Sequence, residues 1–122
     1  MKTKTTKAKK GKSKTEFVGK WHIDEMEEWN EDYFNMEVQA YIEIEPNNMG
    51  HFQFGLVCGQ IDGEVVQYPD GKRFEFTWDG NDECDPAQGS GWIKLMDANT
   101  IEGKFKFHLG DSSTFSAKRA KK

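Results

Sequence analysis

The sequence predicts an all-β protein in which about eight short antiparallel strands follow one another up and down and close into a barrel. Apolar and polar residues alternate with the period of two that turns one side of a strand towards a core. Turn signals recur roughly every 8–12 residues, and no stretch has a convincing helical period. Because most connections are short, an up-and-down meander is favoured over a Greek key, and closure removes exposed strand edges.

Length and composition indicate one domain with an aromatic core. The chain has 122 residues, 35% of them hydrophobic and 13% aromatic, so a few large rings must supply much of the buried surface. No apolar run approaches the roughly 20 residues of a membrane span. The basic N-terminus lacks the apolar stretch of a secretory signal, which predicts a cytoplasmic location. Two cysteines, Cys58 and Cys84, are too few for a disulfide framework and are expected to be free thiols.

Charge is divided sharply along the chain. Residues 1–14 contain seven lysines, and residues 118–122 contain three more lysines and one arginine. The span between them holds all 21 acidic residues and six basic ones, a formal charge of about −15. We therefore expect a body that repels nucleic acid and has no basic face, with tails that attract polyanions.

This composition also sets the domain boundaries. Residues 1–16 are almost devoid of apolar side chains and are predicted to be a disordered lysine-rich tail. Residues 17–119 are expected to form the barrel, and residues 120–122 a short basic tail. Two interpretations of the N-terminal tail are open. It is either a leader that keeps the protein soluble or a basic arm that binds nucleic acid or an acidic partner.

Eight segments have strand character, and each has one apolar side. Their expected bounds are 17–26, 35–45, 51–58, 65–68, 73–78, 92–96, 101–109 and 112–118. The turns between them are signalled at 46–50, 69–71 and 97–99 by proline, glycine, asparagine and aspartate. The acidic stretch Glu25–Asp32 reads as a strand end followed by a loop or a helical turn. Residues 79–91 are predicted to be the longest break between strands.

Alternation selects the side chains expected to face the core. In the second strand these are Ile42 and Ile44. In the third, Cys58 falls on the same side as the phenylalanines and is expected to be a small core residue. The strand at 101–109 places Leu109 on its apolar side.

Both chain ends contribute to the expected closure of the barrel. Gly19 and Trp21 open the first strand, and Lys118 and Arg119 end the last one. We expect the Trp21 indole to plug one end of the barrel with a basic side chain stacked across it. These residues resemble the signature of the calycin superfamily of small barrels, which includes lipocalin-like proteins. The body, with its segment Trp78–Glu83, also resembles a family of small bacterial proteins of uncharacterised function.

The calycin resemblance implies a small apolar or aromatic ligand inside the barrel. Six rings are the expected lining: Phe52, Phe54, Phe76, Trp78, Phe105 and Phe107. The same rings are numerous enough to fill a short barrel completely, which is the alternative.

The predicted loop after Trp78 is the densest cluster of polar groups. Its side chains of interest are Asp79, Asn81, Asp82, Glu83 and Asp85. Three interpretations are open: these side chains form an exposed turn, they form a surface for a basic protein partner, or they supply oxygen ligands to a hard cation. The spacing lacks the glycine and the final glutamate of an EF-hand, and the three histidines lie on different strands. No metal or cofactor is therefore predicted.

No catalytic motif is present, so we expect a protein that is not an enzyme. Three functions stay open. The first is a binding module for a small apolar or aromatic ligand. The second is a protein-interaction module that uses the acidic body and the loop at 79–85. The third is weak, salt-sensitive association of the basic tails with nucleic acid.

Overall fold

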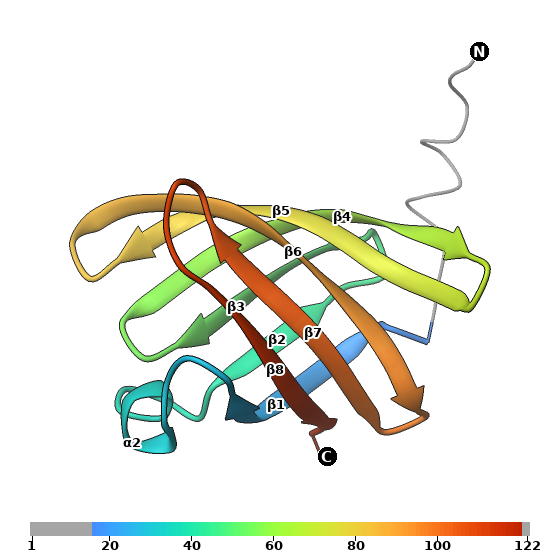
Figure 1. The fold of residues 1–122 in the computed structure, drawn as a ribbon, viewed down its shortest axis with the longest axis horizontal. Helices are drawn as coiled ribbons and strands as arrows, with labels where there is room; N and C mark the ends of the chain where they lie inside the picture. Colours follow the sequence, from blue (N-terminus) through green and yellow to red (C-terminus); the bar gives the residue numbers. More distant parts are fainter. Residues whose placement is uncertain (1–15, 121–122) are drawn as a thin grey trace.

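The computed structural model describes residues 16–120 and forms a closed antiparallel barrel (Figure 1). Neighbouring strands pair in sequence order, and β8 pairs with β1. The elements are β1 (Gly19–Met26), α2 (Glu31–Phe34), β2 (Tyr41–Ile44), β3 (Met49–Phe54), β4 (Val57–Tyr68), β5 (Gly71–Asp82), β6 (Asp85–Asp97), β7 (Thr100–Phe107) and β8 (Ser112–Arg119). The predicted eight-stranded up-and-down barrel is confirmed.

Most of the two predicted tails, at 1–15 and 121–122, lies outside the described residues. Glu16 and Ala120, which were assigned to the tails, contact the barrel. The Glu16 carbonyl accepts a hydrogen bond from Arg119, and the Ala120 amide donates one to the Lys20 carbonyl. Among the described residues, no helix is long and apolar enough to span a membrane.

The expected strand at 51–58 is in fact two strands joined by a tight turn at Gly55 and Leu56. Gly55 has φ 57°, a left-handed conformation that favours glycine, and the Tyr33 ring lies against it. The turn shifts the inward side by one residue, so Val57 is buried and Cys58 takes a half-buried outward position. The prediction that Cys58 belongs to the core is therefore wrong.

The predicted break at 79–91 is also wrong, because this stretch is a long hairpin. β5 continues to Asp82 and β6 begins at Asp85, so the expected strand at 92–96 is only the end of β6. The two strands pair without interruption from Phe74–Ile93 to Asp82–Asp85.

Two other expectations need smaller corrections. Of the strand expected at 35–45, only Tyr41–Ile44 is extended, and α2 ends just before it. Ile42 and Ile44 face the core as predicted, at 0% and 1% exposure. Leu109 lies beyond the end of β7 with φ 60° and is 91% exposed, so it is not a core residue.

The core is built from rings that lie over inward-facing glycines. A β-carbon on Gly59 would lie 2.9 Å from the rings of Phe52 and Trp78, and one on Gly103 would lie 2.7 Å from the Phe115 ring. Glycines therefore supply the room that large rings need inside a barrel of this strand number.

One end of the barrel is closed by Trp21. Its indole is fully buried and donates a hydrogen bond from Nε1 to the Phe17 carbonyl at 2.9 Å. The Arg119 guanidinium stacks 4.1 Å above the ring centroid and donates to the carbonyls of Val18 and Ala98. Gly19, with φ 134°, leaves room for Arg119, since a β-carbon there would lie 2.7 Å from its Nη1.

The other end carries α2 (Figure 1). Asn30 caps the helix by accepting a hydrogen bond from the Tyr33 amide, and Glu31 and Asp32 in the first turn suit the helix dipole. Phe34 buries the helix against the barrel at 2% exposure.

Candidate functional site

The interior assigned to an apolar ligand is filled by its own rings. Phe52, Phe54, Phe76, Trp78 and Phe105 are each exposed by 4% or less. Phe105 lies at the centre, with its ring centroid 4.7 Å from that of Phe52 and 5.1 Å from that of Phe54. These five rings pack against one another and leave almost none of their surface exposed, which agrees with the alternative of a barrel filled by its own side chains.

The sixth ring, Phe107, lies at the rim of the barrel beside Trp29. Both side chains are half-buried, and their centroids are 6.1 Å apart with the planes at 64°. The ring centroid of Phe54 lies 5.3 Å from that of Trp29, and the ring centroid of Trp78 lies 5.2 Å from that of Phe107. The two exposed aromatic edges thus rest on the core.

These two rings line a pocket of about 350 Å³, which we call the mouth pocket. Pro86 and Ala87 at the start of β6 complete its apolar side. Trp29 is held in place because the chain around it is anchored to β8. The Glu27 amide donates to the Thr114 carbonyl at 3.0 Å, and the Glu28 amide to the Ser113 hydroxyl at 3.0 Å.

The polar side of the mouth pocket contains three carboxylates, Asp82, Asp85 and Asp111, together with Gln88 and His108. Asp82 and Asp85 are direct partners at the tip of the β5–β6 hairpin, where like charges are destabilising. None of the three forms an ion pair with another residue of the 16–120 range. A bound cation would relieve this repulsion.

The other residues singled out between Trp78 and Pro86 are dispersed. Asp79 and Asn81 lie in β5, with Asp79 on the outward side, while Glu83 occupies the two-residue turn with φ 63°. The structure therefore brings only Asp82 and Asp85 of this group into the mouth pocket.

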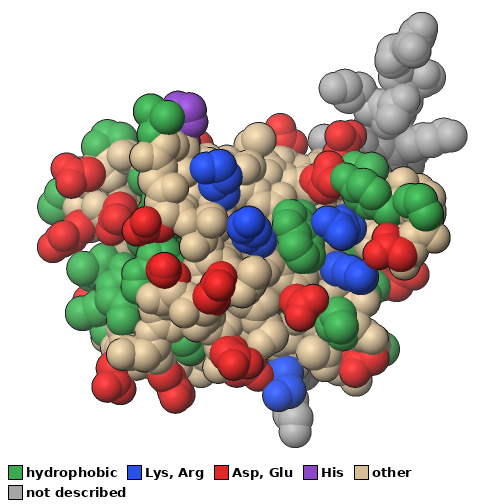
Figure 2. Space-filling model, in the orientation of Figure 1, with side chains coloured by type: hydrophobic (Ala, Val, Ile, Leu, Met, Phe, Trp, Pro, Cys, Tyr) green, Lys and Arg blue, Asp and Glu red, His purple; other side chains and the backbone are tan. Residues whose placement is uncertain are grey.

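The acidic body has a basic face after all, contrary to expectation. Four cationic side chains lie outward on β5, β6 and β7: Arg73, Lys94, Lys104 and Lys106. Figure 2 shows Lys and Arg side chains gathered over the middle of the face that β6 and β7 present. We call these four residues the cationic face.

Aromatic rings and a few acidic side chains contact the basic side chains of this face. The Arg73 guanidinium lies 4.9 Å from the Tyr68 centroid and 4.5 Å from that of Trp92. Lys94 pairs with Asp70 at 3.3 Å, and its hydrogen bond lowers the pKa of that carboxyl. A hydrogen bond to Glu75 raises the pKa of Tyr68.

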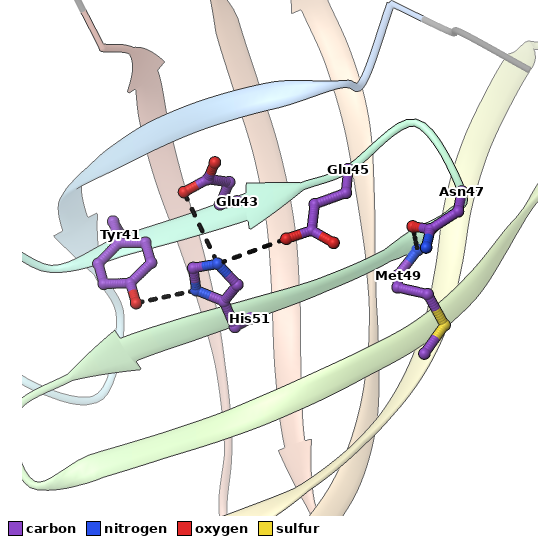
Figure 3. A network of polar contacts seen from close by, with 6 residues as sticks. All are labelled: Tyr41, Glu43, Glu45, Asn47, Met49 and His51. Carbon is purple, nitrogen blue, oxygen red and sulfur yellow. Dashed lines mark hydrogen bonds and ion pairs between the residues drawn. The ribbon is translucent and has the colours of Figure 1, made fainter.

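A polar network lies on the outer side of β2 and β3 (Figure 3). The Tyr41 hydroxyl is 3.0 Å from His51 Nδ1, and His51 Nε2 is 3.8 Å from a carboxylate oxygen of Glu43 and of Glu45. Partial burial raises the pKa of Tyr41, and the Glu43 charge adds to this. These cross-strand pairs join two strands and stabilise the sheet.

Within the described residues, no group of three or more His, Cys, Asp or Glu side chains is placed to hold a metal ion. Both cysteines are free, Cys58 half-buried and Cys84 exposed in the hairpin turn.

The mouth pocket depends on residues that the sequence did not single out. Trp29 lies in an acidic loop, and Asp111 follows a glycine after β7. The only sequence signal was a large aromatic ring among acidic side chains, which is unusual for a solvated loop.

Comparison with known protein families, with curated proteins and with solved structures found no match to this chain in any of the three.

Proposed function

We propose that the protein is a non-enzymatic binding module whose mouth pocket takes a cationic side chain, lysine above all, from a basic protein partner. One observation carries the proposal. Two half-buried aromatic rings line the same pocket at the rim of the barrel as three carboxylates that have no ion-pair partner within residues 16–120.

The chemistry of lysine suits such a pocket. Its aliphatic stem packs on apolar surface while the ammonium stays at the edge. An ammonium near an indole face gains from the ring's quadrupole, and the exposed carboxylates of Asp82 and Asp85 add a Coulombic attraction that salt screens. A body charge of about −15 raises the local concentration of a basic partner.

The test is the affinity for a labelled peptide with one lysine, measured by fluorescence anisotropy at low salt. Trp29→Ala is expected to weaken binding about 2- to 30-fold, the range that a cation–π contact of about 0.5–2 kcal/mol supports. The double substitution Asp82→Asn with Asp85→Asn is expected to weaken binding by at least about 2-fold.

The matched control removes the same two charges elsewhere, as Glu64→Gln with Asp97→Asn. It leaves affinity close to that of the parent, apart from the small effect of net charge. The Asp82/Asp85 variant also melts no lower than the parent, because it removes repulsion between direct cross-strand partners. The proposal would be wrong if the parent, the Trp29→Ala variant and the Asp82/Asp85 variant all bound the peptide with equal affinity.

The cationic face favours a second candidate, weak association with single-stranded nucleic acid. Cations interleaved with Trp92 and Tyr68 are the side chains that such surfaces use. A labelled oligothymidylate is expected to bind the full chain at low salt, with affinity falling steeply as salt rises.

Two full-length variants separate the contributions to that binding. Lys104→Glu with Lys106→Glu weakens it more than Lys20→Glu on a different face, if the barrel takes part. Replacing the seven lysines of residues 2–14 with glutamine measures the tail. Binding that ignores salt would rule out this candidate.

Two further expectations stay part of the proposal. The arrangement of Gly19, Trp21 and Arg119 supports a calycin-like barrel. The free thiols of Cys58 and Cys84 support a cytoplasmic location.

A further inference from the structure

A groove of about 740 Å³ crosses β4, β5, β6 and β7 on the outer surface. Two rows of outward side chains cross it. Gln60, Asp79 and Gln88 are successive cross-strand partners in one row, and Thr77, Ser90 and Lys106 in the other. The short side chains of Thr77 and Ser90 lie in the middle, which accounts for the depression.

The six side chains of these rows are polar, and none bonds to a neighbour among the described residues. Within residues 16–120, no hydrogen bond or ion pair involves the side-chain polar atoms of any of the six. Their density would allow such bonds, since Asp79 lies between two glutamines.

Some outward polar side chains elsewhere on the barrel do pair, whereas others, such as Gln53 and Lys104, have no hydrogen bond or ion pair within residues 16–120. Lys118 bonds to Asp24 at 3.0 Å, and Ser116 bonds to Glu25 at 3.4 Å. The Tyr41 hydroxyl contacts His51 (Figure 3). The groove thus presents polar side chains whose donors and acceptors are available to a ligand.

The groove is continuous with the mouth pocket, because Gln88 and His108 line both. A ligand held in the mouth pocket therefore reaches the groove over β6 without leaving the surface. Crossing from β6 to β4 covers two strand spacings of about 4.8 Å, the length of about three extended residues.

We infer that the partner is an extended polypeptide segment. Its lysine enters the mouth pocket and its main chain lies in the groove, an inference that rests on the proposed function. A main chain offers a donor and an acceptor at almost every residue. Glutamine amides donate and accept, carboxylates accept, and lysine donates, so the groove complements a main chain of either polarity.

Two ligands separate the groove from the mouth pocket. The first is Nα-acetyl-lysine methylamide, which is too short to lie along the groove. The second is a peptide with one central lysine that is flanked on both sides by uncharged serine residues. Affinities for the full chain are measured by nuclear magnetic resonance titration in the same buffer.

The peptide is expected to bind more tightly, by about 2- to 10-fold for each main-chain hydrogen bond gained. The double substitution Gln60→Ala with Ser90→Ala removes this gain and leaves the affinity for the single lysine unchanged. Gln53→Ala, an outward position on β3 outside the groove, is the control and changes neither affinity.

Each other outcome overturns the inference in a distinguishable way. Equal affinity for both ligands would show that the groove does not bind the main chain of the peptide. The proposed lysine site in the mouth pocket would be unaffected by this result. Binding of neither ligand overturns the proposed function and the inference together. Binding of maltotriose that is lost in the Gln60/Ser90 variant, without any gain from peptide length, reassigns the groove to polyhydroxyl ligands.

Discussion

Replacing Trp21 with alanine is expected to lower the free energy of unfolding by about 3–5 kcal/mol, the usual cost of emptying a buried aromatic site. The indole is fully buried, and its loss also removes the surface on which Arg119 stacks at 4.1 Å. Arg119 bonds to carbonyls near both the first strand and the β6–β7 turn, so the substitution loosens the contact between the chain ends.

Chemical denaturation followed by circular dichroism measures this effect. Trp92→Ala is the matched control, because the same ring is removed from the outer surface, and its cost is expected to be clearly smaller. A Trp21→Ala protein that unfolds at the same denaturant concentration as the parent would show that Trp21 does not close the barrel.

The substitution Gly59→Ala is expected to destabilise the barrel by about 1–3 kcal/mol, because it overpacks the interior. The new methyl would lie 2.9 Å from the rings of Phe52 and Trp78, closer than carbon atoms tolerate. Since both obstacles are side chains, a smaller residue at position 52 relieves the part of the clash that involves Phe52, while the contact with Trp78 remains.

A double-mutant cycle with Phe52→Leu tests this explanation. The double variant is expected to be more stable than the sum of the single effects, with a coupling of about 0.5–3 kcal/mol. Phe74→Leu is the control partner, because its ring covers Gly63 rather than Gly59. Additive costs with Phe52→Leu would mean that the interior has spare room, and a ligand cavity would regain support.

The sequence predicted the strands whose two sides differ in hydrophobicity. Phe74, Phe76 and Trp78 alternate with polar residues, and all three are buried as expected. Closure at Trp21 was also foreseeable, although the choice between Lys118 and Arg119 was not. Lys118 points to solvent and pairs with Asp24, whereas Arg119 stacks on the indole.

The errors have identifiable physical causes. The turn at Gly55 and Leu56 contains no polar turn residue, so alternation ran through it undetected. The tip of the β5–β6 hairpin is exposed on both sides, and its strands are held by pairing rather than by burial. Hydrophobic period cannot detect such a strand.

Surface sites were harder to foresee because they depend on register. Arg73, Lys94 and Lys104 lie on three strands and come together only when these strands pair. The same holds for Trp29 and Asp85, which are far apart in the sequence and meet at the rim of the barrel. A single sequence without a register gives no information on such neighbours.

The most direct test of the proposed mouth pocket is a ¹⁵N-resolved nuclear magnetic resonance titration of the full chain with the lysine peptide. We expect saturable shifts of the Trp29 indole N–H and of the Ala87 and Asp111 amides, while the Trp92 indole N–H stays in place. Shifts confined to Trp92 and its neighbours, or spread evenly over the acidic surface, would contradict a lysine site at the mouth of this barrel.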